Sequence, residues 1–233
     1  MLKVDAIIQA RVGSSRLPNK VIKKISNLFI IEWVIIRLKK SKRIRRIILA
    51  TTKKKQDKFL IKIAKKHKIF SYAGSEKNVL NRFYTAAKFY KSNLIVRVCA
   101  DNPFVDPKEI DFLIKKFNYK LHHYGFNHQN RLNTLYADGF GAEIIRFNTL
   151  KKLNKIVKKQ NQKEHVTQYI WDNLKNFNIL HFKAPKKLAY PNLKFDINTN
   201  KDFKKIKSLV FKGNIDVNTP ANKIIKIKLK QLN

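Results

Sequence analysis

The sequence predicts an α/β protein with a mostly parallel sheet flanked by helices. Short apolar segments of strand length alternate with longer amphipathic segments over residues 4–100. A helical segment joins each strand to the next, which is the connection that parallel neighbours need. No apolar run in the sequence approaches the ~18 residues of a membrane-spanning helix, so these segments are expected to form the core of a folded domain.

In the first half of the chain, the expected elements follow one another without long gaps. Buried strands are predicted at residues 4–10, 46–52, 69–72 and 94–100. Helices are predicted at residues 29–42, at 57–68, and from the turn at 74–80 to about residue 90. Ser75 is the expected N-cap of the last helix. In the first, Ile31, Val34 and Leu38 recur at helical spacing and form a face that packs on the first strand.

The second half of the chain has a less regular pattern. Residues 117–134 have no clear period, and residues 136–145 turn into a strand. Helices are predicted at 148–158 and at 164–173, the second beginning at Glu164. A strand is predicted to end within residues 193–198, and Asp196 lies inside it. Thr199 and Asp202 then form a capping box for a helix over residues 202–211.

Composition limits the classes of function. The 233 residues are treated as one domain, with 52 Lys and Arg against 15 Asp and Glu and a formal net charge of +37. The lysines are spread over the polar faces of predicted helices, and Lys, Asn, Ile and Phe are enriched together, so no specific nucleic-acid binding is expected. Cys99, the single cysteine, lies in an apolar run and is expected to be an inert thiol. The N-terminus lacks a secretory apolar region, so a cytoplasmic protein without membrane insertion is expected.

The first predicted strand leads into a loop of small and cationic residues. The small residues are Gly13, Ser14 and Ser15, and the cations are Arg11, Arg16 and Lys20. Small residues let backbone N–H groups approach an anion closely, and Arg and Lys bind phosphate oxygens. The loop is neither a Walker A loop nor a dinucleotide fingerprint, because Asn19 precedes Lys20 and the loop has only one glycine. Two interpretations stay open: a phosphate-binding loop, or a tight solvated turn with surface cations.

A second candidate site follows the fourth predicted strand. Asp101 comes directly after this strand, and ligands of open α/β sheets gather at the carboxyl ends of the strands. A carboxylate repels a phosphate unless a cation lies between them, so we favour Asp101 as a Mg²⁺ ligand over a simple turn residue. Asp106, before Pro107, fits a turn or N-cap role. Asp196 is either an edge-strand acid or a second carboxylate on the same cation.

The irregular middle of the chain is a candidate acceptor region. Its histidines, which include His122, His123 and His128, do not have the spacing of a tight zinc site. We expect residues 117–147 to cover an acceptor or to form a subunit contact. Arg131 lies in this segment and is suited to an acceptor carboxylate. His165, further along, is expected to be a capping or surface residue unless it contacts a ligand.

Together these motifs resemble those of the cytidylyltransferases that activate acidic sugars as CMP derivatives. The nearest branch is that of the spore coat polysaccharide biosynthesis protein F, related to the CMP-KDO and acylneuraminate synthetases. The resemblance covers residues 3–210 in the family's order. The matching stretches are residues 9–20, 74–76, 79–83, 97–103, 138–143, 164–167 and 195–199.

The resemblance implies a GT-A-like nucleotidyltransferase fold that transfers CMP from CTP to the hydroxyl of an acidic sugar, releasing pyrophosphate, in surface polysaccharide biosynthesis. It implies Mg²⁺ as cofactor, held by Asp101 and Asp196, and a homodimer that completes the acceptor pocket. By position it assigns nucleotide binding to Arg11, Gly13, Ser14, Ser15, Arg16, Lys20 and Arg97. The resemblance also assigns catalysis to Lys20, Arg16 and Asp101, and sugar contacts to Arg131, Asp138, Glu143 and His165.

The chain departs from the family pattern at three positions near these motifs. Asn19 stands where the family usually has Gly, and Asn is tolerated there because it visits left-handed conformations. Ala100 also replaces a Gly, and Gly141 stands where the branch often has Asp. The alternatives are a glycosyltransferase that uses a finished nucleotide-sugar, and a relative that binds nucleotides without catalysis.

Overall fold

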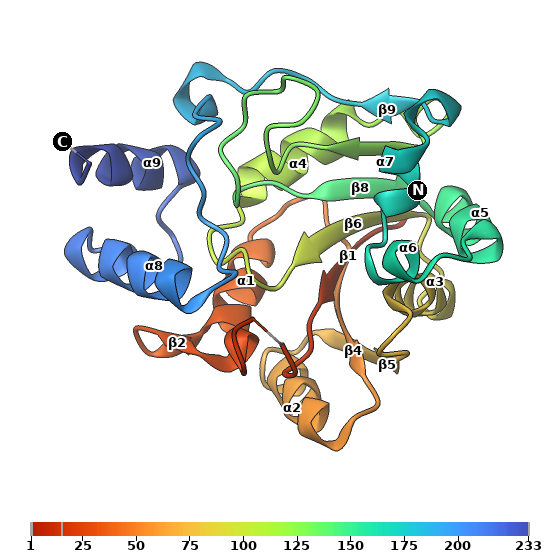
Figure 1. Ribbon diagram of the computed structural model, residues 1–233, viewed down its shortest axis with the longest axis horizontal. Helices are drawn as coiled ribbons and strands as arrows, with labels where there is room; N and C mark the ends of the chain where they lie inside the picture. The colour runs from red at the N-terminus through yellow and green to blue at the C-terminus, as the bar shows by residue number, and fades with distance from the viewer. Residues whose placement is uncertain (1, 15, 233) are drawn as a thin grey trace.

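A seven-stranded sheet forms the centre of the protein in the computed structural model, which describes residues 2–14 and 16–232 (Figure 1). From one edge to the other, its strands are β5 (Phe70–Gly74), β4 (Arg46–Thr52), β1 (Val4–Gln9), β6 (Leu94–Cys99), β8 (Glu143–Arg146), β7 (Tyr124–Phe126) and β9 (Ile179–Leu180). The first four pair in parallel, whereas β8 is antiparallel to both β6 and β7. The predicted α/β class with a mostly parallel sheet is therefore confirmed.

Helices cover both faces of the sheet. Side chains of β1 alternate between the faces, so that Ala6 and Ile8 pack on one side and Ile7 on the other. The helices on the first face are α1 (Ile30–Leu38), α2 (Lys58–Lys66) and α4 (Pro107–Lys116). Those packed on the second are α3 (Val79–Phe89), α5 (Phe147–Ile156) and α7 (Gln168–Asp172). This double covering explains why the strands are almost wholly apolar in sequence.

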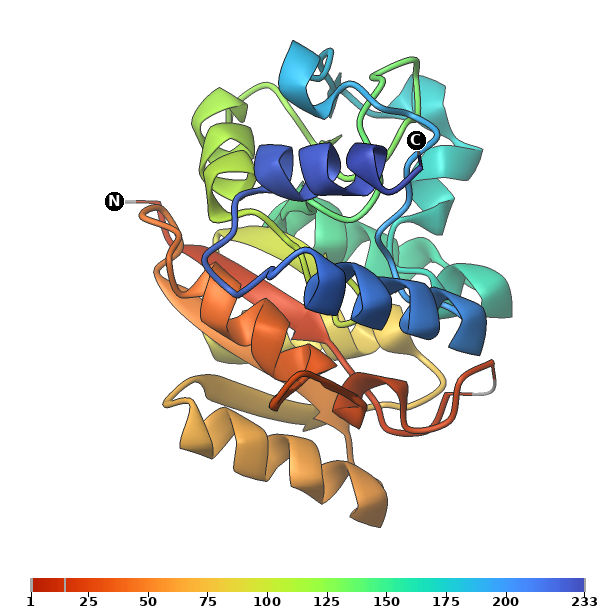
Figure 2. The ribbon, with the colours of Figure 1, turned by 90° about the vertical axis from the view of Figure 1, so that its left-hand side faces the viewer.

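The last two helices lie beside one another outside the first layer of helices (Figure 2). They are α8 (Asn200–Lys212) and α9 (Ala221–Lys230). Together with Trp33 of α1 and Phe104, their apolar faces form a second core. Thr199 and Asp202 form the predicted capping box of α8, whereas the sequence patterns had not predicted α9. The shorter elements are the hairpin β2 (Lys24–Ile25) and β3 (Leu28–Phe29), the helix α6 (Gln160–Glu164), and the 3₁₀ turns η1 (Lys20–Ile22), η2 (Lys55–Asp57), η3 (Leu174–Asn176) and η4 (Lys186–Leu188).

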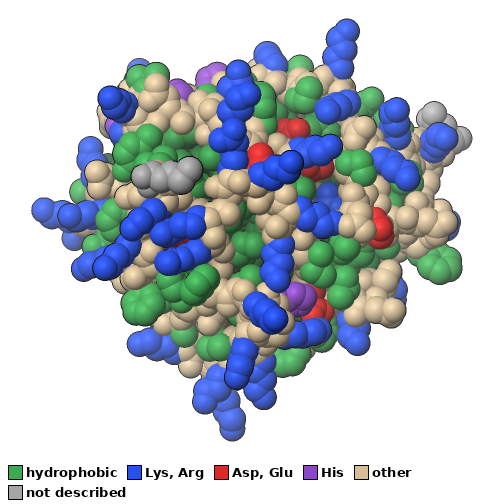
Figure 3. Space-filling view, turned by 180° about the vertical axis from the view of Figure 1, so that it is seen from behind, with side chains coloured by type: hydrophobic (Ala, Val, Ile, Leu, Met, Phe, Trp, Pro, Cys, Tyr) green, Lys and Arg blue, Asp and Glu red, His purple; other side chains and the backbone are tan. Residues whose placement is uncertain are grey.

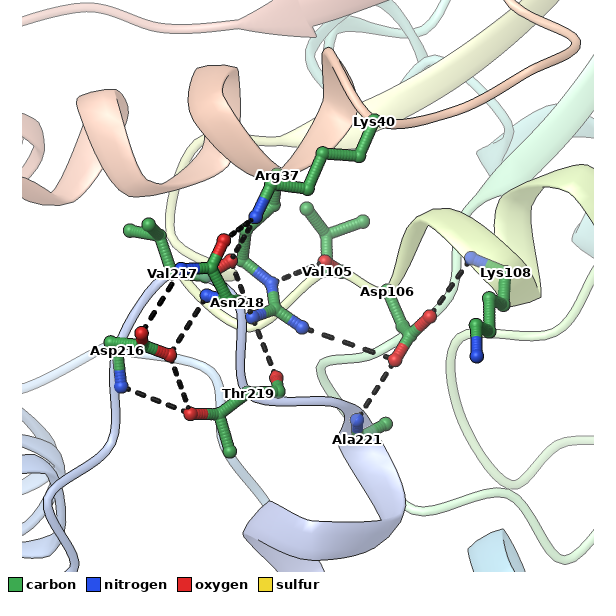
Figure 4. A network of polar contacts seen from close by, with 10 residues as sticks. All are labelled: Arg37, Lys40, Val105, Asp106, Lys108, Asp216, Val217, Asn218, Thr219 and Ala221. Carbon is green, nitrogen blue, oxygen red and sulfur yellow. Dashed lines mark hydrogen bonds and ion pairs between the residues drawn. The ribbon is translucent and has the colours of Figure 1, made fainter.

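Arg37 fastens the segment between α8 and α9 to the rest of the protein (Figure 4). Its Nε donates to the Val105 carbonyl at 2.7 Å and its Nη1 to the Thr219 carbonyl at 2.8 Å. Asp106 lies 3.9 Å from the guanidinium and accepts from the backbone N–H of Ala221 at 2.8 Å. Asp106 is also the N-cap of α4, as predicted. One buried arginine thus joins α1, α4 and the C-terminal pair of helices.

Several predicted boundaries were wrong, and local hydrogen bonds explain why. The first long helix ends at Leu38 rather than residue 42, because Asp111 accepts from the backbone N–H groups of Lys42 and Arg43 and turns the chain. Asn78, not Ser75, is the N-cap of α3: its side chain accepts from the N–H of Asn81, the role predicted for Ser75.

Two further errors concern residues near the candidate site. Glu164 ends α6 instead of beginning a helix, and the chain is extended at His165 before α7 begins. The strand expected at residues 193–198 is absent from the described residues, apart from a bridge between Asp138 and Lys194. Its backbone N–H groups donate to two different segments: that of Phe195 to the Asp138 carbonyl, and that of Ile197 to the Asp101 carbonyl. The segment therefore crosses the end of the sheet instead of extending it.

The many cations do not gather in one patch on the face seen from behind. Lys and Arg side chains are spread over that whole face, between apolar and uncharged groups (Figure 3). Within the described part of the chain, no helix is both long enough and apolar enough to cross a membrane.

Candidate functional site

The candidate site lies where β1 and β6 end side by side. Gln9 is in register with Cys99, so the loop after β1 and the turn after β6 leave the same edge of the sheet. From β1 the chain goes to β4 and β5 on one side, and later to β6 on the other. Such a reversal opens a crevice in which α/β proteins bind ligands. A cavity is present there, and six of the predicted site residues line it: Arg11, Ser14, Arg16, Lys20, Asp101 and His165.

The loop after β1 is held from beneath by Asp57. One oxygen of its carboxylate accepts from the Val12 backbone N–H at 2.7 Å, and the other accepts from the Thr52 hydroxyl. Asn19 adopts the left-handed conformation, with φ 59° and ψ 21°, which fits its place where the family usually has glycine. Gly13 lies in the same exposed loop, whereas Ser15 is outside the described residues. Asp57 therefore fixes the start of the loop, and Gly13 next to it is exposed.

The cations of the loop differ in their surroundings. Lys20 is buried, and its Nζ donates to Oδ2 of Asp101 at 2.8 Å. Arg11 is exposed and lies 3.5 Å from Glu76, whose other oxygen is 2.8 Å from Lys54. Arg16 is exposed, with no ion pair to any described residue. Arg16 and the exposed side of Arg11 are therefore available to an anionic ligand, and Lys20 is engaged.

Asp101, Asp138 and Asp196 lie near one another at this edge. The Ile197 N–H donates to the Asp101 carbonyl at 3.0 Å, and the Phe195 N–H to the Asp138 carbonyl at 3.0 Å. Burial and the nearby Asp101 raise the pKa of Asp196. Burial, with Asp196 next in effect, raises the pKa of Asp138 to about 7. Three carboxylates thus lie near one another, with Lys20 bound to Asp101 and with Lys194 near Asp138 and Asp196. A divalent cation would relieve the repulsion between the carboxylates.

This donor set fits Mg²⁺ only with help from a ligand. Among the described residues, no three His, Cys, Asp or Glu side chains are placed to hold a metal ion by themselves. Mg²⁺ is usually bound by one or two carboxylates together with substrate phosphates and waters. Asp101 lies beside the loop after β1 and is one such carboxylate, whereas Asp196 lines a different cavity from the one that contains Asp101.

Arg97 and Glu143, predicted to contact nucleotide and sugar, pair with each other beneath the site. Glu143 is buried and also accepts from the hydroxyls of Tyr124 and Thr167, the latter at 2.8 Å. Although burial alone would raise it, the attraction of Arg97 lowers the pKa of Glu143 to about 2. Neither residue lines the cavity. The pair ties Thr167, two residues after His165, to the sheet, so it positions that segment.

Arg131 lies outside this cavity, above an aromatic ring. Its guanidinium carbon is 4.4 Å from the centre of the Trp171 ring. Leu132, Asn133 and Leu135 follow it with positive φ values of 48°, 55° and 64°. Left-handed backbone at leucine is costly and is found mainly where surrounding structure or function demands it. The loop between β7 and β8 thus presents Arg131 in a defined position.

The cavity is also lined by residues to which the sequence analysis assigned no binding role. They are Gln9, Ala10, Val21, Glu76, Val79, Arg82, Cys99, Ala100 and Glu164. Arg82 is the most unexpected, because it is almost fully buried. It occupies the apolar face of α3, three residues after Val79. An arginine on an otherwise apolar helix face is visible in the sequence and could have marked this residue as a candidate. Cys99 matches its predicted inert character, since burial raises the pKa of its thiol to about 12.

A family model for the cytidylyltransferases matches residues 6–232. The chain belongs to the cytidylyltransferase family. This family member is 30% identical to the spore coat polysaccharide biosynthesis protein SpsF of Bacillus subtilis over 224 residues, which are 94% of this chain and 91% of SpsF. A solved cytidylyltransferase from Leptospira borgpetersenii serovar Hardjo-bovis is 28% identical, with a TM-score of 0.91 over 100% of this chain and 96% of that one. The resemblance read from the motifs is confirmed.

The fold of this family member also recurs in a more distant enzyme. A solved CMP:2-keto-3-deoxy-manno-octonic acid synthetase complexed with CTP has a TM-score of 0.64 at 14% identity. The match covers 90% of this chain and 99% of that one. At that identity the likeness concerns the fold, and it confirms the predicted nucleotidyltransferase architecture.

Proposed function

We propose that this protein transfers CMP from CTP to a hydroxyl of an acidic sugar and releases pyrophosphate. The sugar oxygen forms a bond to the α-phosphorus, and the bond from that phosphorus to the bridging oxygen of the β-phosphate breaks. The observation that carries the proposal is the meeting of the cationic loop and Asp101 in one cavity at the end of β1 and β6. The kinship to SpsF supports a role in surface polysaccharide biosynthesis.

The loop after β1 is assigned to the triphosphate. Arg16 has no protein partner among the described residues, and guanidinium groups bind phosphate oxygens in forked geometry. Lys20 exchanges Asp101 for a phosphate oxygen when CTP binds, and then stabilises charge that develops on the departing pyrophosphate. Gly13 and Ser14 leave their backbone N–H groups open to the same oxygens.

Asp101 and Asp196 are assigned to Mg²⁺. When bound, the ion neutralises phosphate charge and orients the α-phosphate for in-line attack. Asp138 lies beside this pair, and we assign it to contact with the sugar.

The acceptor side is assigned to Arg131 and His165. Arg131 is held over Trp171 and forms no ion pair with a described residue, so its guanidinium is suited to the carboxylate of an acidic sugar. His165 is exposed at the cavity wall. Residues 117–147, which supply β7, β8 and the loop that carries Arg131, are also proposed as the contact of a homodimer.

The deciding experiment incubates the protein with Mg²⁺, one nucleoside triphosphate at a time, and a panel of acidic and neutral sugars. Pyrophosphate release is followed by a coupled assay, and the products by mass spectrometry. Release with CTP and an acidic sugar, with a mass gain equal to one CMP unit, is expected. Release only with UTP or GTP, or only with neutral sugar phosphates, would reject the substrate assignment.

A second arm of that experiment addresses the alternatives. Transfer from a supplied nucleotide-sugar without pyrophosphate release would identify a glycosyltransferase instead. Nucleotide binding without any turnover across the panel would identify a non-catalytic relative. Size-exclusion chromatography with light scattering of the same sample measures whether the protein is a dimer.

A further inference from the structure

Arg82 is a buried guanidinium at the wall of the candidate nucleotide cavity. It lies in the first turn of α3, and only 1% of the residue is exposed to solvent. Its aliphatic stem packs against the end of β5, where Gly74 leaves room: a Cβ at that position would lie 2.9 Å from Cγ of Arg82. The side chain is therefore held in one direction, toward the cavity that Arg11 and Lys20 also line.

The protein satisfies only part of the hydrogen-bonding capacity of Arg82. Its Nη1 donates to the Ser75 carbonyl at 2.5 Å, whereas its buried Nε has no acceptor among the described residues. Within residues 2–14 and 16–232, no carboxylate forms an ion pair with it, and burial together with the nearby Arg11 lowers its pKa to about 10. A buried cation with unused donors is costly unless a ligand supplies the missing acceptors.

The surroundings of Arg82 do not suit a second phosphate site. Glu76, three residues before α3, and Glu164, at the end of α6, line the same cavity. Glu76 is already paired with Arg11 and Lys54, whereas Glu164 forms no ion pair with a described residue and its charge repels phosphate. Val79 adds an apolar surface to this wall. The groups proposed to bind phosphate and metal, which are the cations of the loop and Asp101, belong to a different part of the cavity, because they follow the ends of β1 and β6. Carboxylates, an apolar surface and one forked donor are the groups that bind the edge and face of a flat, uncharged base.

We propose that Arg82 selects cytosine, an inference that rests on the proposed use of CTP. Cytosine presents O2 and N3 as two adjacent acceptors, which match the parallel donors of a guanidinium. Its 4-amino group is a donor, and the carboxylate of Glu164 on the same wall can accept from it. Uracil has a donor at N3 and an acceptor at O4. Its N3–H would therefore face the donors of Arg82, and its O4 would face a carboxylate oxygen. A site built on such buried polar groups rejects the mismatched base strongly.

Binding measurements separate this role from phosphate binding. Dissociation constants for CTP, UTP and pyrophosphate are measured by calorimetry at one fixed salt concentration, for the wild type, Arg82→Met and Arg82→Lys. The wild type is expected to prefer CTP over UTP by about 10- to 100-fold. Both variants should lose most of that preference, because neither has the fork, while their affinity for pyrophosphate stays within about twofold of the wild type.

Arg146→Met is the matched control. Arg146 also has a buried Nε without an acceptor, but it lies at the far end of β8, opposite Leu94 at the start of β6, and outside the cavity. Its substitution should leave the ratio of CTP to UTP affinity unchanged. Arg82→Lys keeps the charge and most of the packing, so it gives an answer if Arg82→Met fails to fold.

Three results would overturn the assignment. They are a wild type that binds CTP and UTP equally, Arg82 variants that keep the wild-type preference, and variants that lose pyrophosphate affinity as much as CTP affinity. The first two leave nucleotidyl transfer standing and remove only the role of Arg82. A wild type that binds no nucleoside triphosphate overturns the proposed function as well, so the two failures are distinguishable.

Discussion

The ammonium nitrogen of Lys20 lies 2.8 Å from Oδ2 of Asp101, although the two residues are 81 positions apart. The pair joins the loop after β1 to the turn after β6, and Lys20 is largely buried. Asp101 is the carboxylate proposed to bind Mg²⁺. In this structure its partner is Lys20, whose ammonium group would also attract a phosphate. We therefore expect Lys20 to leave Asp101 for a phosphate when nucleotide binds, so that metal and nucleotide bind together.

Removal of this lysine should expose the carboxylates to metal. In Lys20→Met, Asp101 loses its cation while Asp196 stays nearby, so Mn²⁺ affinity without nucleotide should rise by about tenfold. CTP affinity should fall in the same variant, because a phosphate contact is lost. Electron paramagnetic resonance titration of free Mn²⁺ measures the first effect and calorimetry the second. Unchanged Mn²⁺ affinity in Lys20→Met, or equal affinity in Lys20→Met and Lys20→Met/Asp101→Asn, would contradict the prediction.

Arg16 should matter for nucleotide binding and not for the fold. It is exposed and unpaired among the described residues, so Arg16→Ala should leave the unfolding midpoint within error. Loss of charge-assisted hydrogen bonds to phosphate should weaken CTP binding by roughly 10- to 100-fold. Arg43→Ala, an exposed arginine outside the cavity, is the control and should bind CTP like the wild type. Equal CTP affinity in the wild type and both variants would remove Arg16 from the site.

Much of the α/β core could be predicted because its signals are local. Strand β4 was predicted to the residue, and β1 and β6 were predicted with one residue too many, because buried parallel strands are continuous apolar runs. The loop after β1 and Asp101 were found because they directly follow such strands. Topology then brings them together without further information.

The parts that could not be predicted depend on contacts between distant segments. The segment around Asp196 alternates like a strand, but its N–H groups are taken by Asp138 and Asp101. Arg97 and Glu143 matched family motifs, yet nothing in their spacing shows that they neutralise each other beneath the site. Arg82 was overlooked because burial of its guanidinium depends on β5 and the cavity, not on its neighbours in sequence.

Arg37 should contribute strongly to stability but not to nucleotide binding. Arg37→Met removes hydrogen bonds to Val105 and Thr219 and leaves Asp106 without its buried cation. Loss of one partner from such a network should lower the free energy of unfolding by roughly 3 kcal/mol or more. Urea denaturation measures the cost, and Lys40→Ala, an exposed neighbour that bonds to Val217, should cost less than about 1 kcal/mol. A cost for Arg37→Met no larger than that of the control would contradict the prediction.

Gly141 should not tolerate the aspartate that is common in its branch. A Cβ at this position would lie 2.2 Å from the backbone oxygen of Asn127 and 2.4 Å from its Oδ1. Asn127 cannot withdraw, because its backbone N–H donates to the Ala142 carbonyl and its Oδ1 accepts from the Ala142 N–H. Its Nδ2 also donates to the Glu109 carbonyl. Gly141→Ala should therefore cost about 3 kcal/mol, and Gly141→Asp more, by urea denaturation. Gly13→Ala, whose new Cβ meets only the end of the Gln56 side chain at 3.0 Å, is the control and should be nearly neutral in stability.

His128 should make the protein less stable in acid. Part of the residue is exposed, but its Nδ1 is buried without a partner, and burial lowers its pKa from 6.5 to about 4. Between those pH values the unfolded chain binds a proton that the folded protein does not, so the free energy of unfolding falls as the pH falls from about 6.5 to 4. The full effect of this one residue is at most about 3 kcal/mol. Urea denaturation at several pH values measures it, with His128→Phe as the variant that keeps the edge-to-face contact with Phe126 but cannot titrate. The wild-type curve should fall more steeply than that of His128→Phe in this window, and parallel curves would show that His128 is not protonated on unfolding.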